Sequence, residues 1–291
     1  MSAPEPSAAD ESVNRDAVQQ PTRRRASFRG LPLLPPGRFD DYSVLGGLSY
    51  ELRETFRPPF EVIQVIFFNV ALVLAGWFLL GPDTITSERF ASLVFLPAVL
   101  ASWAFSDVPA TNLYASQPKR ALGALGHPDR LRNLILSRNL TLWCLIAPAG
   151  AILSWILALD DNDIPKTIIV AAVVLILPFG FLGITSIVAP LLPYHPMSIQ
   201  ERRKKRNTWI RWGVAVVIPF ILTMPSALIL LLPAIGLVEA MGRSSTSVGL
   251  ALLVTIVWTY IVRKIAVGIT LRLTARREER LRAFLSDPSL G

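Results

Sequence analysis

The sequence predicts an all-α integral membrane protein with six transmembrane helices and both termini in the cytoplasm. Three observations lead to this prediction. Of the 291 residues, 52% are hydrophobic and only 17% are charged, whereas a soluble domain carries roughly a quarter of its residues as charges. The apolar residues gather in six long runs. The Lys and Arg residues lie between these runs, almost all of them in alternate loops.

The N-terminal residues 1–41 are expected to form a disordered cytoplasmic tail, because their composition is too poor in apolar residues to bury a core. An amphipathic helix follows. Its apolar residues recur every three or four positions, at Leu45, Leu48, Leu52 and Phe56. This spacing predicts a helix that lies at the membrane surface before the first span, with charged residues such as Glu51 on its other faces.

The six apolar runs are long enough to cross a bilayer, which takes about 20 helical residues. They cover about residues 60–80, 90–105, 140–159, 168–192, 210–237 and 246–262. Helix is required, because backbone polar groups in lipid have to be satisfied within the segment. The fifth run is longer than one crossing needs and contains three prolines. We therefore assign a transmembrane domain to residues 42–273 and a basic cytoplasmic segment to residues 274–291.

The basic residues set the orientation. Of the 29 Lys and Arg residues, 26 lie in the tail, in the loops after the second and fourth runs, and in the C-terminal segment. The remaining three loops hold Arg89, Lys166 and Arg243. Because positively charged loops stay in the cytoplasm, the net charge of +8 indicates topology and not a nucleic-acid partner. Arg outnumbers Lys and Ala is abundant, which favours a GC-rich bacterial genome and hence a bacterial plasma membrane.

The sequence contains no arrangement of residues that is typical of catalysis. The two histidines, His127 and His195, lie far apart and without a nearby carboxylate cluster, so neither a zinc site nor a histidine base is supported. The single cysteine, Cys144, allows no disulfide within the chain. A phosphate-binding P-loop is absent as well, since the chain has no Gly-Lys dipeptide. We expect neither an enzyme nor a resident cofactor or metal.

The interiors of the six runs contain no Asp, Glu, Lys, Arg or His, which disfavours ion-coupled transport. Uncharged polar residues are present, and those that could line a substrate path are Gln64, Asn69, Thr223 and Ser226. Hydrogen bonding and close packing between helices is the commoner use of such residues.

The longest internal loop, residues 106–139, interleaves leucines with basic residues. This pattern predicts short amphipathic helices beneath the membrane, interrupted at Gly126-His127-Pro128. Two uses of the loop are open. It could bind anionic lipid headgroups, or it could dock a cytoplasmic partner on apolar anchors surrounded by basic side chains.

The same loop resembles a known family. Thr111-Asn112-Leu113-Tyr114, residues 122–125 and residues 128–140 look like the region between the second and third spans in permease subunits of type-2 ATP-binding-cassette exporters. The Ser and Pro-Tyr-His-Pro motifs in residues 186–196 are similar to the pattern that follows the fourth span there. In that family the loop rests on the ATPase subunit. The resemblance implies an ATPase-coupling loop that includes Asn112, Leu122, Leu125, Pro128, Arg130 and Leu131.

The resemblance also implies a function. The chain would be the membrane-spanning subunit of an ATP-driven exporter, with ATP bound by a separate cytoplasmic ATPase. Six spans make half of a usual translocation path, so a homodimer or a pair with a similar permease is expected. The surface helix would be the elbow helix of the family, and the fifth run would end in a re-entrant helix. The alternative is a non-transporting membrane scaffold or assembly factor that holds a cytoplasmic partner or anionic lipid.

Overall fold

The computed structural model describes residues 42–56, 111–158, 164–195, 206–242 and 244–287, together with the single positions 63, 67, 71 and 75. The chain divides into two units, Met1–Leu31 and Pro32–Gly291, and every described residue belongs to the second. The predicted tail and almost all of the first two predicted spans therefore lie outside the described residues.

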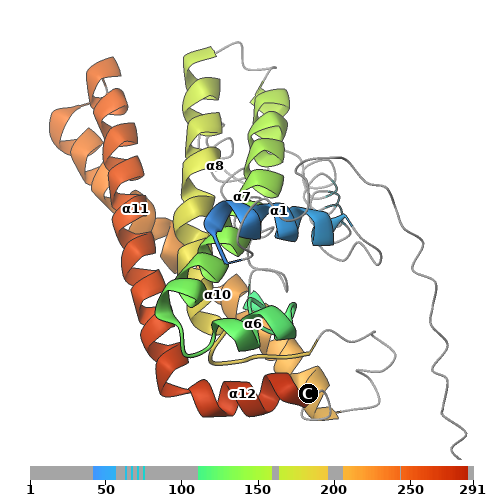
Figure 1. Cartoon of the computed structure of the whole chain (residues 1–291). Coiled ribbons are helices and arrows are strands. Elements are labelled where there is room, and N and C mark those ends of the chain that lie inside the picture. The colour runs from blue at the N-terminus through green and yellow to red at the C-terminus, as the bar shows by residue number, and fades with distance from the viewer. Residues whose placement is uncertain are drawn as a thin grey trace, which may run out of the picture. The chain divides into compact units, whose positions relative to one another are not determined.

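Every regular element in the described ranges is a helix (Figure 1). In chain order the elements are α1 (Val44–Thr55), α6 (Pro118–Ala124), α7 (Pro128–Ala158), α8 (Ile164–Thr185), the 3-10 helix η2 (Ser186–Val188), α10 (Arg206–Met241), α11 (Ser245–Arg276) and α12 (Glu278–Ser286). Three described segments are long and apolar enough to cross a membrane: Pro128–Ile152, Ala171–Val188 and Ser245–Arg276. The all-helical class is confirmed for this part of the chain and a membrane location is supported, whereas six spans and cytoplasmic termini stay predictions.

The start of α7 differs from the prediction. The third span was expected to begin at residue 140, but α7 begins at Pro128, so the second half of the predicted loop is the first part of the spanning helix. Proline suits the first position of a helix, and Asp129 in the first turn complements the helix dipole. The predicted interruption is present, because Gly126 adopts a φ of 84° between α6 and α7, a conformation that glycine tolerates best.

The fifth predicted run forms one continuous helix, α10, with no re-entrant break over Arg206–Met241. Pro233 lies inside it and cannot donate a backbone hydrogen bond to the carbonyl of Ile229, four residues earlier. The indole Nε1 of Trp258 in α11 donates to that same carbonyl at 2.9 Å. A neighbouring helix thus satisfies the carbonyl group that the proline leaves free, as prolines within membrane helices require.

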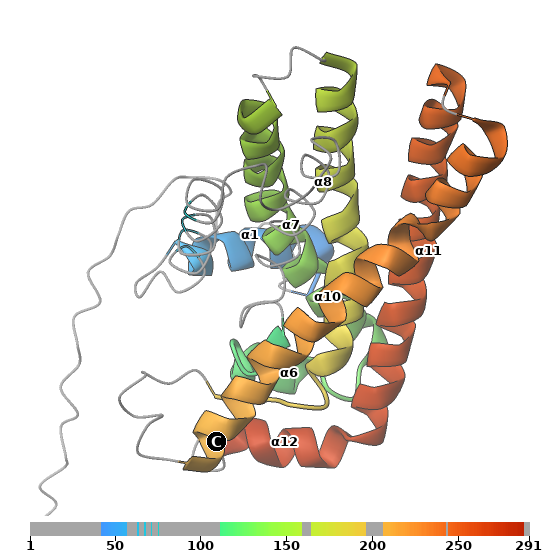
Figure 2. The same ribbon diagram turned by 180° about the vertical axis from the view of Figure 1, so that it is seen from behind.

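The ends of two other helices also differ from the predicted runs, and α8 ends before the predicted residue 192. Helix α8 covers Ile164–Thr185, and α11 continues past the predicted end of the sixth run at residue 262 to Arg276. Helix α10 contacts both α8 and α11 (Figure 2). The segment 274–291, predicted only as a basic extension, contains a further helix, α12, that packs against α6.

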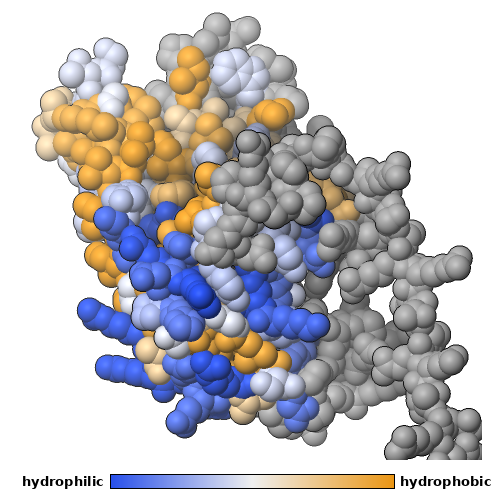
Figure 3. Space-filling model, viewed as in Figure 1, coloured by the Kyte–Doolittle hydropathy of each residue, from blue (hydrophilic) through white to orange (hydrophobic). Residues whose placement is uncertain are grey.

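Two clusters of buried side chains stabilise the described helices. One lies between α7 and α8 and includes Leu142, Val174 and Phe181. The other joins residues 113–135 to α12, with Leu134 and Phe284 among its members. Figure 3 shows hydrophobic residues gathered over the upper parts of α10 and α11 and hydrophilic residues around α6 and α12. This separation is expected of a protein with one part in lipid and the other in water.

Candidate docking site at the turn between α6 and α7

The turn between α6 and α7 presents five consecutive exposed residues, 126–130, which we call the exposed turn. It contains two of the residues that the family resemblance assigned to ATPase coupling, Pro128 and Arg130. The other four lie elsewhere. Leu122 is partly buried, Asn112 is buried, and Leu125 and Leu131 are in the interior, with 3% and 6% of their surfaces exposed.

Helix α12 explains why Leu125 and Leu131 are buried. Both belong to the same cluster as Leu281, Phe284 and Leu285 on the apolar face of α12. These two leucines therefore cannot act as surface anchors for a partner in this arrangement. The spacing of the apolar residues in residues 281–285 is the signal in the sequence that could have revealed the covering helix.

Helix α12 also fixes the turn through a polar contact. The Arg282 Nη2 atom donates to the carbonyl oxygen of Leu125 at 2.9 Å and to Glu278 Oε1 at 2.8 Å. A Cβ atom on Gly126 would lie 3.2 Å from the same guanidinium group. Backbone conformation and space thus both favour glycine at the first residue of the exposed turn.

Tyr42 holds the opposite side of the turn. Its hydroxyl donates to the carbonyl oxygen of Arg120 at 3.4 Å, and its ring lies 5.0 Å from the guanidinium carbon of Arg130. The hydroxyl occupies the position that a Cβ atom on Gly123 would need. The chain before α1 is therefore in direct contact with α6 and with the start of α7.

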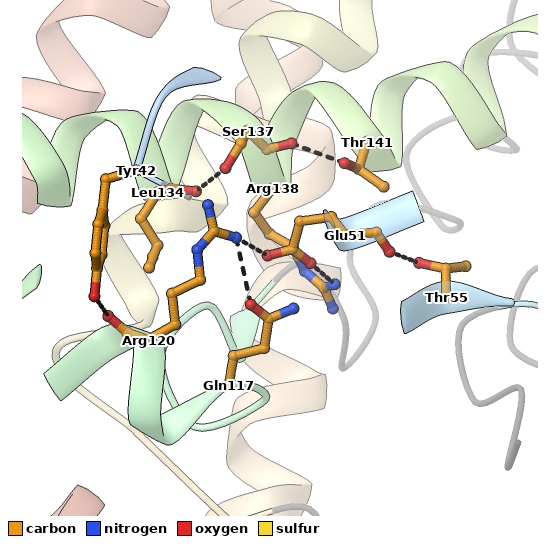
Figure 4. A network of polar contacts seen from close by, with 9 residues as sticks. All are labelled: Tyr42, Glu51, Thr55, Gln117, Arg120, Leu134, Ser137, Arg138 and Thr141. Carbon is orange, nitrogen blue, oxygen red and sulfur yellow. Dashed lines mark hydrogen bonds and ion pairs between the residues drawn. The ribbon is translucent and has the colours of Figure 1, made fainter. Parts of the chain in front are cut away.

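A buried ionic cluster ties α1 to α6 and α7 (Figure 4). Glu51, only 2% exposed, accepts a hydrogen bond from Arg138 Nη1 at 2.6 Å on one oxygen and from Arg120 Nη1 at 3.3 Å on the other. Arg120 Nη1 also donates to Gln117 Oε1 at 3.5 Å. We call Glu51, Gln117, Arg120 and Arg138 the Glu51 cluster. Two guanidinium groups share one carboxylate here, so removal of Glu51 would leave two buried positive charges.

Helix α1 turns its polar side inward to reach this cluster. A Cβ atom on Gly47 would lie 2.6 Å from the side chain of Ser137, so glycine allows α1 to approach α7 closely. Leu45 and Phe56 are exposed instead. The sequence analysis found the helix and its apolar residues but missed the role of Glu51, because a lone acidic residue on an amphipathic helix is usually solvated.

Further buried hydrogen bonds join the same region to the other helices. The hydroxyls of Tyr114 and Thr274 lie 2.8 Å apart and link the segment before α6 to the end of α11. Burial raises the pKa of Tyr114. The amide of Asn139 donates to Ser186 Oγ at 3.0 Å, which links α7 to η2. His195 Nε2 lies 2.8 Å from the carbonyl oxygen of Phe284, which places this histidine in a structural contact with α12.

Of the four residues predicted to line a substrate path, the structure describes the side chain of one, Ser226. Gln64 and Asn69 lie outside the described residues, as does the side chain of Thr223. Ser226 is buried within α10, with 3% of its surface exposed. Within the described ranges no three His, Cys, Asp or Glu side chains are grouped so as to hold a metal ion, and the expectation that the protein needs no cofactor stays a prediction.

The fold and this region indicate a helical membrane protein. The described residues are all-helical, with three segments able to cross a membrane and a polar region built on α6, α7 and α12. No family model, curated protein or solved structure matches the chain. The likeness to exporter permeases therefore rests on the motifs of its own sequence.

Proposed function

We propose that the chain is the membrane-spanning permease subunit of an ATP-driven exporter, and that a separate ATPase subunit docks on the exposed turn. The observation that carries the proposal is the continuity of α7. This helix starts in the exposed turn at Pro128 and runs without interruption for 31 residues, through a segment able to cross a membrane. A push on its first turn would be transmitted along the helix into the spanning region, as far as Pro148, which lies inside α7 and removes one backbone hydrogen bond.

The contacts around the exposed turn support this proposal. Arg282 connects the turn to α12, and the Glu51 cluster connects α6 and α7 to α1. A partner that moved the turn would therefore move these four helices together. Movement of packed elements between two discrete arrangements is how such displacements are usually converted into a change of conformation.

The distribution of charge supports the proposed orientation. Basic side chains gather on α12 and on the last turn of α11, among them Arg276, Arg280 and Arg282, and α12 packs against α6 next to the exposed turn. Such residues are enriched on the cytoplasmic side of membrane proteins. We accordingly place the exposed turn in the cytoplasm of a bacterial cell and propose a homodimer, or a pair with a similar permease, as the transporting unit.

The test is purification of the tagged chain from its native membranes in mild detergent, followed by measurement of Mg-ATP hydrolysis in the eluate. The proposal predicts hydrolysis that is lost in His127→Glu and Arg130→Glu, which alter exposed residues of the turn. Arg272→Glu, at an exposed position on α11, is the matched control and should retain activity. Size-exclusion profiles verify that each variant is folded.

A scaffold or assembly factor is the other candidate, and the same experiment separates the two. A scaffold would elute with a partner that does not hydrolyse ATP, and that result would contradict the exporter proposal. The exposed turn fits both functions, whereas its direct continuation into a spanning helix favours the transporter.

A further inference from the structure

A cavity of about 420 Å³ lies between α7, α8 and α11. This volume is within the range of roughly 300–1,000 Å³ that is typical of ligand sites. Its walls are almost wholly apolar and are formed by Trp143, Leu175, Ile176, Phe179, Ile256, Val257, Thr259 and Tyr260. The cavity is separate from the exposed turn and from the Glu51 cluster, and the proposed function does not use it.

One polar group in the wall has no hydrogen-bond partner. The Thr259 side chain is 1% exposed, and its Oγ1 atom is unpaired among the described residues. Other threonines of α11, such as Thr255 and Thr270, donate to the carbonyl four residues earlier. A buried hydroxyl without a partner is unfavourable, so a ligand atom that reached Thr259 Oγ1 would gain a hydrogen bond there.

Two cations lie on the aromatic rings that form the wall. The guanidinium carbon of Arg263 is 3.9 Å from the centroid of Phe179, and Lys264 Nζ is 4.9 Å from the centroid of Tyr260. Neither cation forms an ion pair with a described carboxylate, and the Nε atom of Arg263 is buried without a hydrogen-bond partner among the described residues. Two of the rings that line the cavity therefore have a cation against them that the described carboxylates leave unneutralised.

Two glycines of α8 fix these positions. A Cβ atom on Gly180 would lie 2.7 Å from Thr259 Cγ2, and one on Gly183 would lie 2.9 Å from Arg263 Cγ. Only glycine at these positions lets α11 approach α8 so closely. The close approach holds Thr259 at the wall and directs the Arg263 guanidinium over Phe179.

We propose that this cavity binds an anionic phospholipid of the cytoplasmic leaflet. One acyl chain occupies the apolar cavity, and the Thr259 hydroxyl donates to an ester oxygen. Arg263 and Lys264 bind the phosphate. Both residues directly follow the sixth apolar run, at the end predicted to face the cytoplasm, where anionic headgroups attract basic side chains. The inference does not depend on the exporter proposal, because it concerns binding and not transport.

Quenching of Trp143 fluorescence tests the proposal, because this indole lines the cavity. The purified full-length chain is placed in phosphatidylcholine vesicles that contain a small fraction of a lipid brominated in its acyl chains. In one set of vesicles the brominated lipid is phosphatidylglycerol, and in the other it is phosphatidylcholine. The Trp143 signal is the difference between each protein and its Trp143→Phe counterpart. We expect stronger quenching by the anionic lipid at equal mole fraction. Equal quenching by the two lipids, or no quenching by either, would overturn the proposal.

Two kinds of variant distinguish binding of the headgroup from binding of the acyl chain. Arg263→Gln and Lys264→Gln should each reduce the preference for the anionic lipid roughly fivefold, whereas Arg272→Gln, farther along α11, should preserve it. Val257→Phe should reduce quenching by both lipids, because a larger side chain fills the cavity. Its control is Leu253→Phe, at an exposed position outside the cavity. The proposal would also be contradicted if Arg272→Gln lost as much preference for the anionic lipid as Arg263→Gln and Lys264→Gln. Unchanged quenching in Val257→Phe would contradict it as well.

Discussion

Glu51 on α1 and Arg138 on α7 form a buried ion pair of 2.6 Å across 87 residues of sequence. Arg120 binds the other oxygen of the same carboxylate at 3.3 Å. Removal of one member of a buried ion pair is costly, because its partner remains charged without compensation. This single carboxylate therefore stabilises the packing of α1 against both α6 and α7.

Substitution of Glu51 is the first prediction. Glu51→Gln should reduce the free energy of unfolding by about 3–5 kcal/mol, the usual cost of breaking a buried pair. Glu279→Gln, at an exposed carboxylate of α12, should change it by less than about 0.5 kcal/mol. Unfolding in mixed detergent micelles measures both values. Similar stabilities for the two variants would show that the Glu51 cluster does not hold these helices together.

The second prediction concerns Trp258 and Pro233. Trp258→Phe should cost about 1 kcal/mol, because the carbonyl of Ile229 loses its donor. In a Pro233→Ala background the backbone N–H at position 233 can donate to that carbonyl, so the same substitution should cost less. A double-mutant cycle measures the difference. Equal costs in the two backgrounds would mean that the indole contact is unrelated to the proline.

The third prediction compares two glycines. Gly126→Ala should reduce stability by about 1–2 kcal/mol, because alanine is strained at a φ of 84°. Gly249→Ala should increase stability by roughly 0.5–1 kcal/mol, because Gly249 lies in α11 with no atom within 4 Å of its Cβ position. Thermal unfolding of the two variants in one detergent checks both signs. If Gly126→Ala left the stability unchanged, the backbone conformation of Gly126 would not be what fixes the exposed turn.

The fourth prediction is a pH dependence at Tyr114. Burial raises the pKa of this phenol, so the folded state keeps the proton that the unfolded state releases near pH 10. The stabilising effect is complete below that pH and is lost as the pH rises above it. Tyr114→Phe should therefore weaken the loss of stability between about pH 9 and 11. Parallel melting curves of the two proteins across this interval would contradict the prediction.

Several features of the fold could be predicted from local sequence patterns. The presence of helix α1 follows from the spacing of Leu45 and Phe56, and the break before α7 follows from Gly126 and Pro128. These features depend on residues that are close in the chain. The positions of α8 and α11 were likewise indicated by continuous apolar runs, although basic residues at the end of α11 hid its full length.

Other features depend on partners that are distant in the sequence. Glu51 is 69 and 87 residues away from the arginines that it binds, so its burial could not be inferred from α1. The carbonyl of Ile229, which Pro233 leaves without an intrahelical donor, accepts a hydrogen bond from an indole of α11. Leu125 and Leu131 had the pattern of surface anchors, and only the position of α12 shows that they are buried. The candidate docking surface consequently moves from the leucines to residues 126–130.

Photocrosslinking from the exposed turn tests the central claim most directly. A photoreactive amino acid is incorporated at His127, and at Leu253 as the control within a spanning segment, and cells are irradiated before the chain is purified. The account predicts a cross-linked partner at position 127 that is also labelled by photoreactive ATP, with no such product at position 253. A product at position 127 that contains only lipid, or only a protein that does not bind ATP, would contradict it.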